Sequence, residues 1–187
     1  WASERNPLCL FAYQTFSKPD FDRFQSQYLT NRFDWALEDF GKKGIEIARP
    51  ESATWLTSLQ QGFLKKDSSG VCILLELAVK DKTGKTPGGC PGRITLELFL
   101  PAEKKEMQVT LQWFQKPAYR LPEASWFSFQ PAVAEGTWIL DKMGQGIDTR
   151  DVVHKGNRKL HAIQSGIRLE SKSGSFSILS LDAPLVA

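Results

Sequence analysis

The chain has 187 residues, of which 41% are hydrophobic and 24% charged, and this composition is typical of one globular domain or of a domain with an appendage. Its net charge of +3 comes from 24 basic residues scattered among 21 acidic ones, which excludes an extended basic surface for nucleic acid. No apolar run approaches the roughly 20 residues of a membrane-spanning helix. We therefore expect neither nucleic acid nor a membrane as a partner.

Residues 1–50 predict one strand followed by a linking helical segment. Residues 8–16 are an apolar run of strand character, and Ser17 then starts a helix as its N-cap, with Pro19 and Asp20 in the first turn. Aromatic side chains recur at helical spacing after this point, and such a stripe must pack against the following sheet or another domain. The members of this aromatic stripe are Phe21, Phe24, Tyr28, Trp35 and Phe40.

Residues 51–187 predict eight or nine short strands separated by turns, with no helix between them, and this pattern favours an antiparallel β-sandwich domain. The run VCILLELAV, residues 71–79, is apolar at both parities except Glu76. We therefore place it in mid-sheet, covered on both faces, with the helical segment as one plausible cover. Residues 80–92 are rich in Gly, Pro and Lys and predict a mobile loop.

An aromatic corner follows between residues 111 and 129. A Lys-Pro step at Lys116 ends one strand because proline cannot donate to a ladder, and the next strand begins near Trp126. Arg120 and Glu123 lie at the strand ends beside these aromatic residues. Such a corner suits the rim of a sugar-binding site, and it is equally typical of an ordinary β-sandwich corner.

The polar segment 141–161 is dense in side chains that donate or accept hydrogen bonds. Asn157, Arg158 and His161 place an amide, a guanidinium and an imidazole near the start of a strand. These groups suit sugar hydroxyls, with Trp126 or Trp138 as a stacking surface. The alternative is a long surface loop held by its own polar side chains.

The sequence contains no arrangement typical of a catalytic or metal centre. Its two histidines, His154 and His161, do not supply the three protein ligands of a catalytic zinc. The three cysteines include no CxxC pair, so three reduced thiols are the simplest interpretation, with one disulfide and one free thiol as the alternative. No GxSxG or GxxxxGKS/T motif is present. We therefore expect no catalytic residue, metal or cofactor in this chain.

Several blocks of the sequence resemble a known family. FQKPAYRLPEASWFSF, WILDKMGQGIDTRDVVHKGNRKLHAI and LSLDAPLVA are similar to the C-terminal part of proteins related to family 38 glycoside hydrolases, the α-mannosidases, and most of all to their poorly characterised microbial relatives. DFDRFQSQYL and FDWALEDFGKKG resemble the linking helix before that region. The resemblance implies a galactose-mutarotase-like supersandwich, joined to an N-terminal catalytic domain that holds zinc and an aspartate nucleophile. No segment here matches those zinc or nucleophile motifs.

The resemblance therefore predicts a non-catalytic C-terminal β-sandwich portion of a mannosidase-like hydrolase, which buttresses the catalytic domain and lines its sugar site. Its implied partners are that catalytic domain, which would carry the zinc, and carbohydrate. From side-chain type and place at strand ends, we expect these sugar contacts: Arg120, Glu123, Trp126, Asn157, Arg158 and His161. The alternatives are a freestanding carbohydrate-binding module and a structural interaction domain that docks another chain through the aromatic stripe. The opening Trp1 is interpreted as a cut in a longer polypeptide, and the compartment is not indicated.

Overall fold

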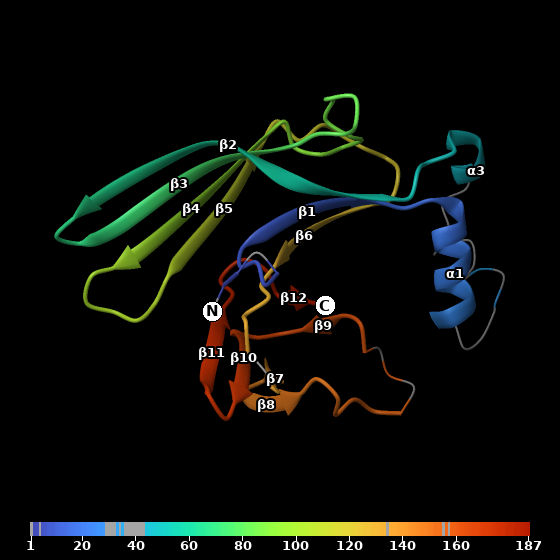
Figure 1. Ribbon diagram of the computed structural model, residues 1–187. Coiled ribbons are helices and arrows are strands. Elements are labelled where there is room, and N and C mark those ends of the chain that lie inside the picture. The colour runs from blue at the N-terminus through green and yellow to red at the C-terminus, as the bar shows by residue number, and fades with distance from the viewer. Residues whose placement is uncertain are drawn as a thin grey trace. The chain divides into compact units, whose positions relative to one another are not determined.

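A computed structural model describes residues 2, 3, 5–28, 33, 35, 44–133, 135–154, 156 and 158–187, and for Tyr28 the backbone alone. Strands make up 47% and helices 9%, which confirms the predicted mainly β fold (Figure 1). All strand pairs of the described residues are antiparallel. The chain divides into a larger unit, Cys9–Phe129, and a smaller unit, Trp1–Leu8 with Gln130–Ala187. The sequence analysis instead predicts a domain boundary between residues 50 and 51. This boundary differs from the division into two units and remains a prediction.

The larger unit contains a six-stranded sheet in the order β5-β4-β3-β2-β1-β6. β1 lies between β2 and β6, so the first strand of the unit pairs with its last one. The described elements of this unit are β1 (Leu10–Thr15), α1 (Lys18–Tyr28), α3 (Ile45–Ala48), β2 (Ala53–Asp67), β3 (Gly70–Val79), β4 (Arg93–Pro101), β5 (Gln108–Phe114) and β6 (Glu123–Ser128).

The core of the larger unit lies on one face of this sheet, which we call the inner face. It is formed by Phe11, Tyr13, Val79, Cys90 and Ile94, all at most 1% exposed. The rings of Phe11 on β1 and Trp113 on β5 lie 6.4 Å apart, although three strands separate β1 from β5 in the ladder. The sheet is therefore curled, so that inner-face side chains of β1 pack against those of β5 at the far end of the strand order.

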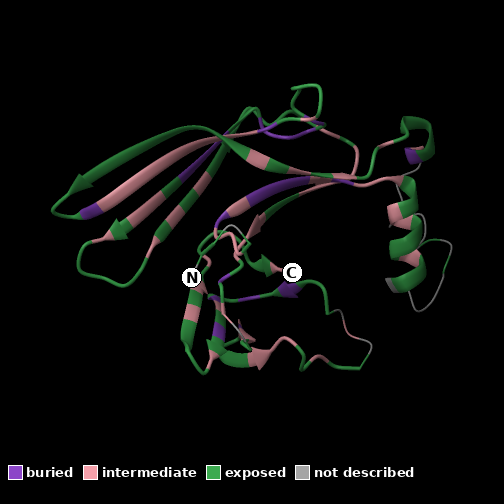
Figure 2. Ribbon diagram, in the orientation of Figure 1, coloured by how far each residue is buried: buried purple, intermediate pink, exposed green. Residues whose placement is uncertain are grey.

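β3 lies in mid-sheet as predicted, but the expectation that it is covered on both faces is wrong. All of its residues between Gly70 and Val79 are only half-buried (Figure 2). The reason is that β1 pairs only with residues 53–56 of β2, while β2 continues to Asp67. Among the described residues nothing covers the inner face beyond the curl, where Leu64 is 71% exposed and Leu100 39%.

The smaller unit contains a four-stranded sheet in the order β11-β10-β7-β8 and a separate pair, β12-β9. Its buried apolar residues are Leu140, Ile163 and Leu169. Met143 and Gly144 join β7 to β8 and both have positive φ, as a two-residue type I′ hairpin requires. The strands are β7 (Thr137–Lys142), β8 (Gln145–Asp148), β9 (His161–Ala162), β10 (Gly166–Ser171), β11 (Gly174–Leu179) and β12 (Leu185–Val186).

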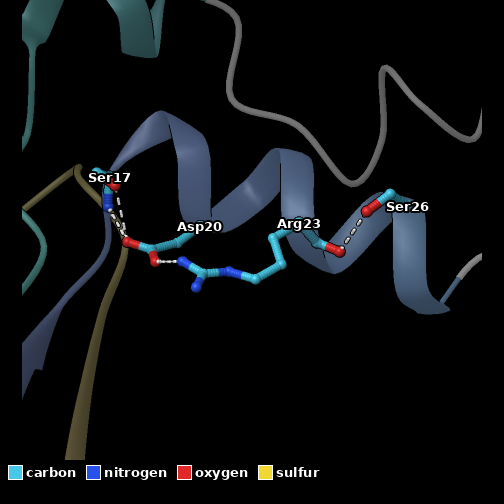
Figure 3. Close-up of polar contacts among 4 residues, drawn as sticks. All are labelled: Ser17, Asp20, Arg23 and Ser26. Carbon is cyan, nitrogen blue, oxygen red and sulfur yellow. Dashed lines mark hydrogen bonds and ion pairs between the residues drawn. The ribbon is translucent and has the colours of Figure 1, made fainter.

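Helix α1 begins as the sequence predicts, with Ser17 at the N-cap position (Figure 3). The backbone N–H and the hydroxyl of Ser17 both donate to Oδ2 of Asp20 at 2.8 Å, and the Arg23 guanidinium pairs with Oδ1. The Asp20 side chain thereby returns to the N-cap backbone as in a capping box. These contacts, led by the Ser17 backbone N–H, lower the pKa of Asp20 to about 2. Of the aromatic stripe, Phe24 and Trp35 are exposed, while Phe40 lies outside the described residues.

We expect Asp20→Asn to lower the thermal unfolding temperature at pH 7, because losing this capping interaction costs about 1 kcal/mol. The carboxyl pKa is about 2 in the folded chain and about 3.9 in an unfolded one. The stabilisation is therefore complete above pH 4 and is lost as the pH falls towards 2. Asp22→Asn, which removes only the exposed pair with Lys18, is the matched control. An equal difference between wild type and Asp20→Asn at pH 7 and pH 2 would contradict this account.

Candidate functional site

The predicted site residues fall into two groups in different units, and each group is described by itself. Arg120, Glu123 and Trp126 belong to the larger unit, and Arg158 and His161 to the smaller one. Asn157 lies outside the described residues.

Glu123 is part of a hydrogen-bonded cluster on the inner face. The Tyr13 hydroxyl donates to Oε2 of Glu123 and accepts the Gly89 backbone N–H at 2.8 Å. The Lys116 ammonium pairs with Oε1 of Glu123 and donates to the Gly89 carbonyl oxygen at 2.9 Å. Both carboxylate oxygens are thus engaged within the protein. We call these four residues the Tyr13–Glu123 network.

The network is largely removed from solvent. Tyr13 is fully buried, while the side chains of Glu123 and Lys116 are 20% and 31% exposed. Burial is the main cause that raises the pKa of the Tyr13 phenol, and the hydrogen bond to Glu123 adds to it. The phenol therefore stays protonated and acts as a donor to the carboxylate. A carboxylate held by a phenol and an ammonium serves first as a structural anchor.

The network also fixes the second half of the loop between β3 and β4. Pro87, Gly89, Cys90 and Pro91 are buried, so the prediction of a mobile loop is wrong for this half. A Cβ atom at Gly89 would lie 2.4 Å from Cβ of Tyr119 and 2.5 Å from Oε2 of Glu123. Only glycine fits between the corner and the carboxylate, which explains the Gly-Gly step at this point of the loop.

Trp126 lies on the opposite, outer face of the sheet. Glu123 and Trp126 are three residues apart on β6, and alternate residues of a strand point to opposite faces. The two side chains therefore do not form one surface. The Trp126 indole N–H donates to Oε1 of Gln14 at 2.8 Å, and Trp126 is 37% exposed. Arg120 is exposed in the corner before β6.

Gln14 is a contact that the sequence analysis missed. It lies in the predicted first strand, but only the register of β1 against β6 brings it beside Trp126. Gln14 and Trp126 are far apart in the sequence, and neither strand order nor register leaves a local pattern in either segment. The sequence therefore carried no signal for the contact between these two side chains.

In the smaller unit His161 is 8% exposed and lies in β9 opposite Val186, so its imidazole belongs largely to the interior. Arg158 is exposed. Other polar groups of the segment 141–161 are held by local contacts. Arg150 pairs with Asp148 at 2.6 Å and lowers the pKa of its carboxyl to about 2, and the Ser165 hydroxyl donates to Asp141. These contacts favour the interpretation as a surface loop held by its own side chains.

Three further features of the described residues bear on site chemistry. No group of three or more His, Cys, Asp or Glu side chains in this part of the chain could hold a metal ion. Cys9, Cys72 and Cys90 are all free thiols, and burial raises the pKa of Cys9 and of Cys90 to about 11. No helix within the described ranges is long and apolar enough to cross a membrane.

These features define a mainly β, antiparallel protein whose clustered polar groups hold one another. The family model described as "Domain of unknown function (DUF5054)" matches residues 1–108, more than half of the chain, and the chain therefore belongs to this family. The matched region contains β1 to β4, the loop that carries Gly89 and Tyr13 of the network. No curated protein and no solved structure matches the chain.

We expect Tyr13→Phe to lower the free energy of unfolding by about 1–3 kcal/mol, because it leaves the buried Gly89 N–H without its acceptor. Urea unfolding followed by tryptophan fluorescence measures this change. Thr57→Val, which removes one half-buried hydroxyl that donates to the Phe11 carbonyl, is a control of the same chemical kind. A Tyr13→Phe variant as stable as wild type would show that the network does not hold the loop.

Gly89→Ala should destabilise the larger unit more than Gly62→Ala does. The added methyl group at Gly89 meets Tyr119 and Glu123 below 3 Å, whereas at Gly62 the nearest atom is a Leu75 methyl at 3.4 Å. Thermal unfolding of both variants under one condition measures the difference. Equal unfolding temperatures would contradict the packing described for the loop.

Proposed function

We propose that this chain is the non-catalytic β-sandwich portion of a mannosidase-like glycoside hydrolase, buttressing the catalytic domain and contributing to its sugar site. The resemblance of the sequence to family 38 glycoside hydrolases supports this proposal, and the mainly β, antiparallel fold is of the kind that the resemblance implies. The partners are the catalytic domain of the same protein, which would hold the zinc, and carbohydrate.

One observation carries the non-catalytic part of the proposal. Glu123 was the carboxylate expected at the sugar rim, and both of its oxygens are engaged by Tyr13 and Lys116. Glycoside hydrolysis needs two carboxyl groups free to exchange protons or to attack the anomeric carbon. A carboxylate bound on both oxygens is better suited to fixing the corner that carries Arg120.

The inner face beyond the curl supports a buttressing role. Paired positions of β2 to β5 place mainly apolar side chains on this face, with Lys66 of β2 opposite Val71 as a charged exception, and Leu64 and Leu100 are exposed there. An apolar sheet face of this kind is typical of a surface that packs against another part of a larger protein. Its central residues are Leu64, Val71, Ile73, Leu98, Leu100 and Val109.

In the longer enzyme, Arg120→Ala and Asn157→Ala should each raise KM or lower kcat for a mannoside, because each removes a polar group expected at the sugar rim. Arg168→Ala removes an exposed arginine of β10 whose ion-pair partner among the described residues is Glu170, and it is the matched control. Unchanged kinetics in folded Arg120 and Asn157 variants would refute their role at the rim.

Native mass spectrometry with metal analysis tests the larger assignment. For the protein isolated from its natural source, the expected result is this chain together with the rest of the same polypeptide, intact or as a second cleaved fragment, with bound zinc. A lone species of 21.1 kDa without zinc would contradict the hydrolase proposal and favour the second candidate. That candidate is a freestanding carbohydrate-binding module, which the exposed and hydrogen-bonded Trp126 specifically favours.

A further inference from the structure

The outer face of β6, β1 and β2 carries one apolar row that crosses three strands. Ala12 pairs with Trp126 on one side and with Leu56 on the other. Trp126 and Leu56 are 37% and 58% exposed, while Ala12 between them is only 7% exposed. The row is thus one residue wide along the strands, with a tryptophan at the sheet edge.

Polar, uncharged side chains lie on both sides of this row. Gln14 pairs with Ala124 and Thr54, and this second row places an amide and a hydroxyl beside the indole. Oε1 of Gln14 accepts the indole N–H, while its amide N–H groups have no partner among the described residues. On the other side of the apolar row, Ser128 pairs with Leu10. The outer-face positions of these three strands contain no charged residue between Thr54 and Ser58, Leu10 and Gln14, or Ala124 and Ser128.

We infer that this outer face binds a neutral saccharide, with Trp126 as the stacking surface and Gln14 and Thr54 as hydrogen-bonding partners. A pyranose ring has one face of C–H groups and a rim of hydroxyls, so it matches an aromatic ring flanked by amide and hydroxyl groups. The absence of charge on these strand positions excludes a preference for anionic sugars. The inference rests on the proposed function for the sugar class, and it assigns binding to this face rather than to Glu123.

The hydrogen bond to Gln14 makes the stacking surface pre-organised. It holds the indole in one orientation, so binding loses little side-chain entropy. The competing occupant is an apolar polypeptide surface from another domain. A single apolar row between two polar rows fits that occupant less well, because unpaired amide and hydroxyl groups would then be buried.

The test is a titration of the 187-residue chain with α-linked mannobiose, followed by two-dimensional NMR of the tryptophan indole N–H groups. We expect the Trp126 indole and the Gln14 side-chain amide to shift, with a Kd of about 1 mM, while the Trp113 indole stays unchanged. Trp126→Ala should weaken binding about tenfold or more, and Gln14→Ala severalfold. Trp126→Phe should retain part of the affinity. Leu64→Ala, an exposed apolar residue of the same sheet off this face, should bind as wild type does.

The outcomes separate the two proposals. If cellobiose or maltose shifts Trp126 and mannobiose does not, the saccharide site stands and the mannosidase assignment fails. If no neutral disaccharide shifts Trp126, or if Trp126→Ala binds as wild type does, the site is refuted, while zinc and activity in the longer protein still decide the hydrolase proposal. If acrylamide quenches Trp126 in the chain but not in the longer protein, the face is a domain interface and the inference is overturned.

Discussion

The larger unit depends on satisfying one buried hydroxyl, that of Tyr13. A fully buried phenol without a partner would cost several times the net value of an ordinary hydrogen bond. Its two partners come from β6 and from the loop after β3, and Lys116 joins the same two segments through Glu123 and Gly89. The corner, the loop and the first strand are therefore fixed by one set of contacts. None of these three segments can change its conformation without disturbing the other two.

Local patterns were sufficient to predict much of this fold. The alternation of the strands, the N-cap at Ser17 and the central place of β3 all follow from residues close together in the chain. The pairing of β1 with β6 could not be predicted, because register between distant strands leaves no periodic trace in either segment. For the same reason, the loop before Gly92 looked unattached in the sequence, although its buried half is bound by residues from both ends of the unit.

The candidate site illustrates the same limit. Residue type predicted Trp126 as a stacking surface and Glu123 as a sugar contact; in the structure Trp126 is 37% exposed, whereas a phenol and an ammonium hold the Glu123 carboxylate. A carboxylate near a turn is usually solvated, and only the structure shows that this one lies on the inner face. The strands thus separate two kinds of chemistry. At β1 and β6, an ion pair and a buried phenol stabilise the inner face, and the outer face presents an aromatic row with neutral polar neighbours.

The position of β1 also governs how the chain can acquire its structure. The Tyr13–Glu123 contact joins residues 110 positions apart, and β6 can add to the sheet only after everything between them has been made. Such non-local pairing slows folding, because loop closure must precede the contacts that compensate for it. During synthesis, β1 emerges before the other strands of its sheet, and its apolar side chains stay unpaired until those strands follow, which exposes the nascent chain to aggregation. β1 therefore supplies two core residues, Phe11 and Tyr13, and yet gains its second partner strand, β6, only when the whole unit has been synthesised.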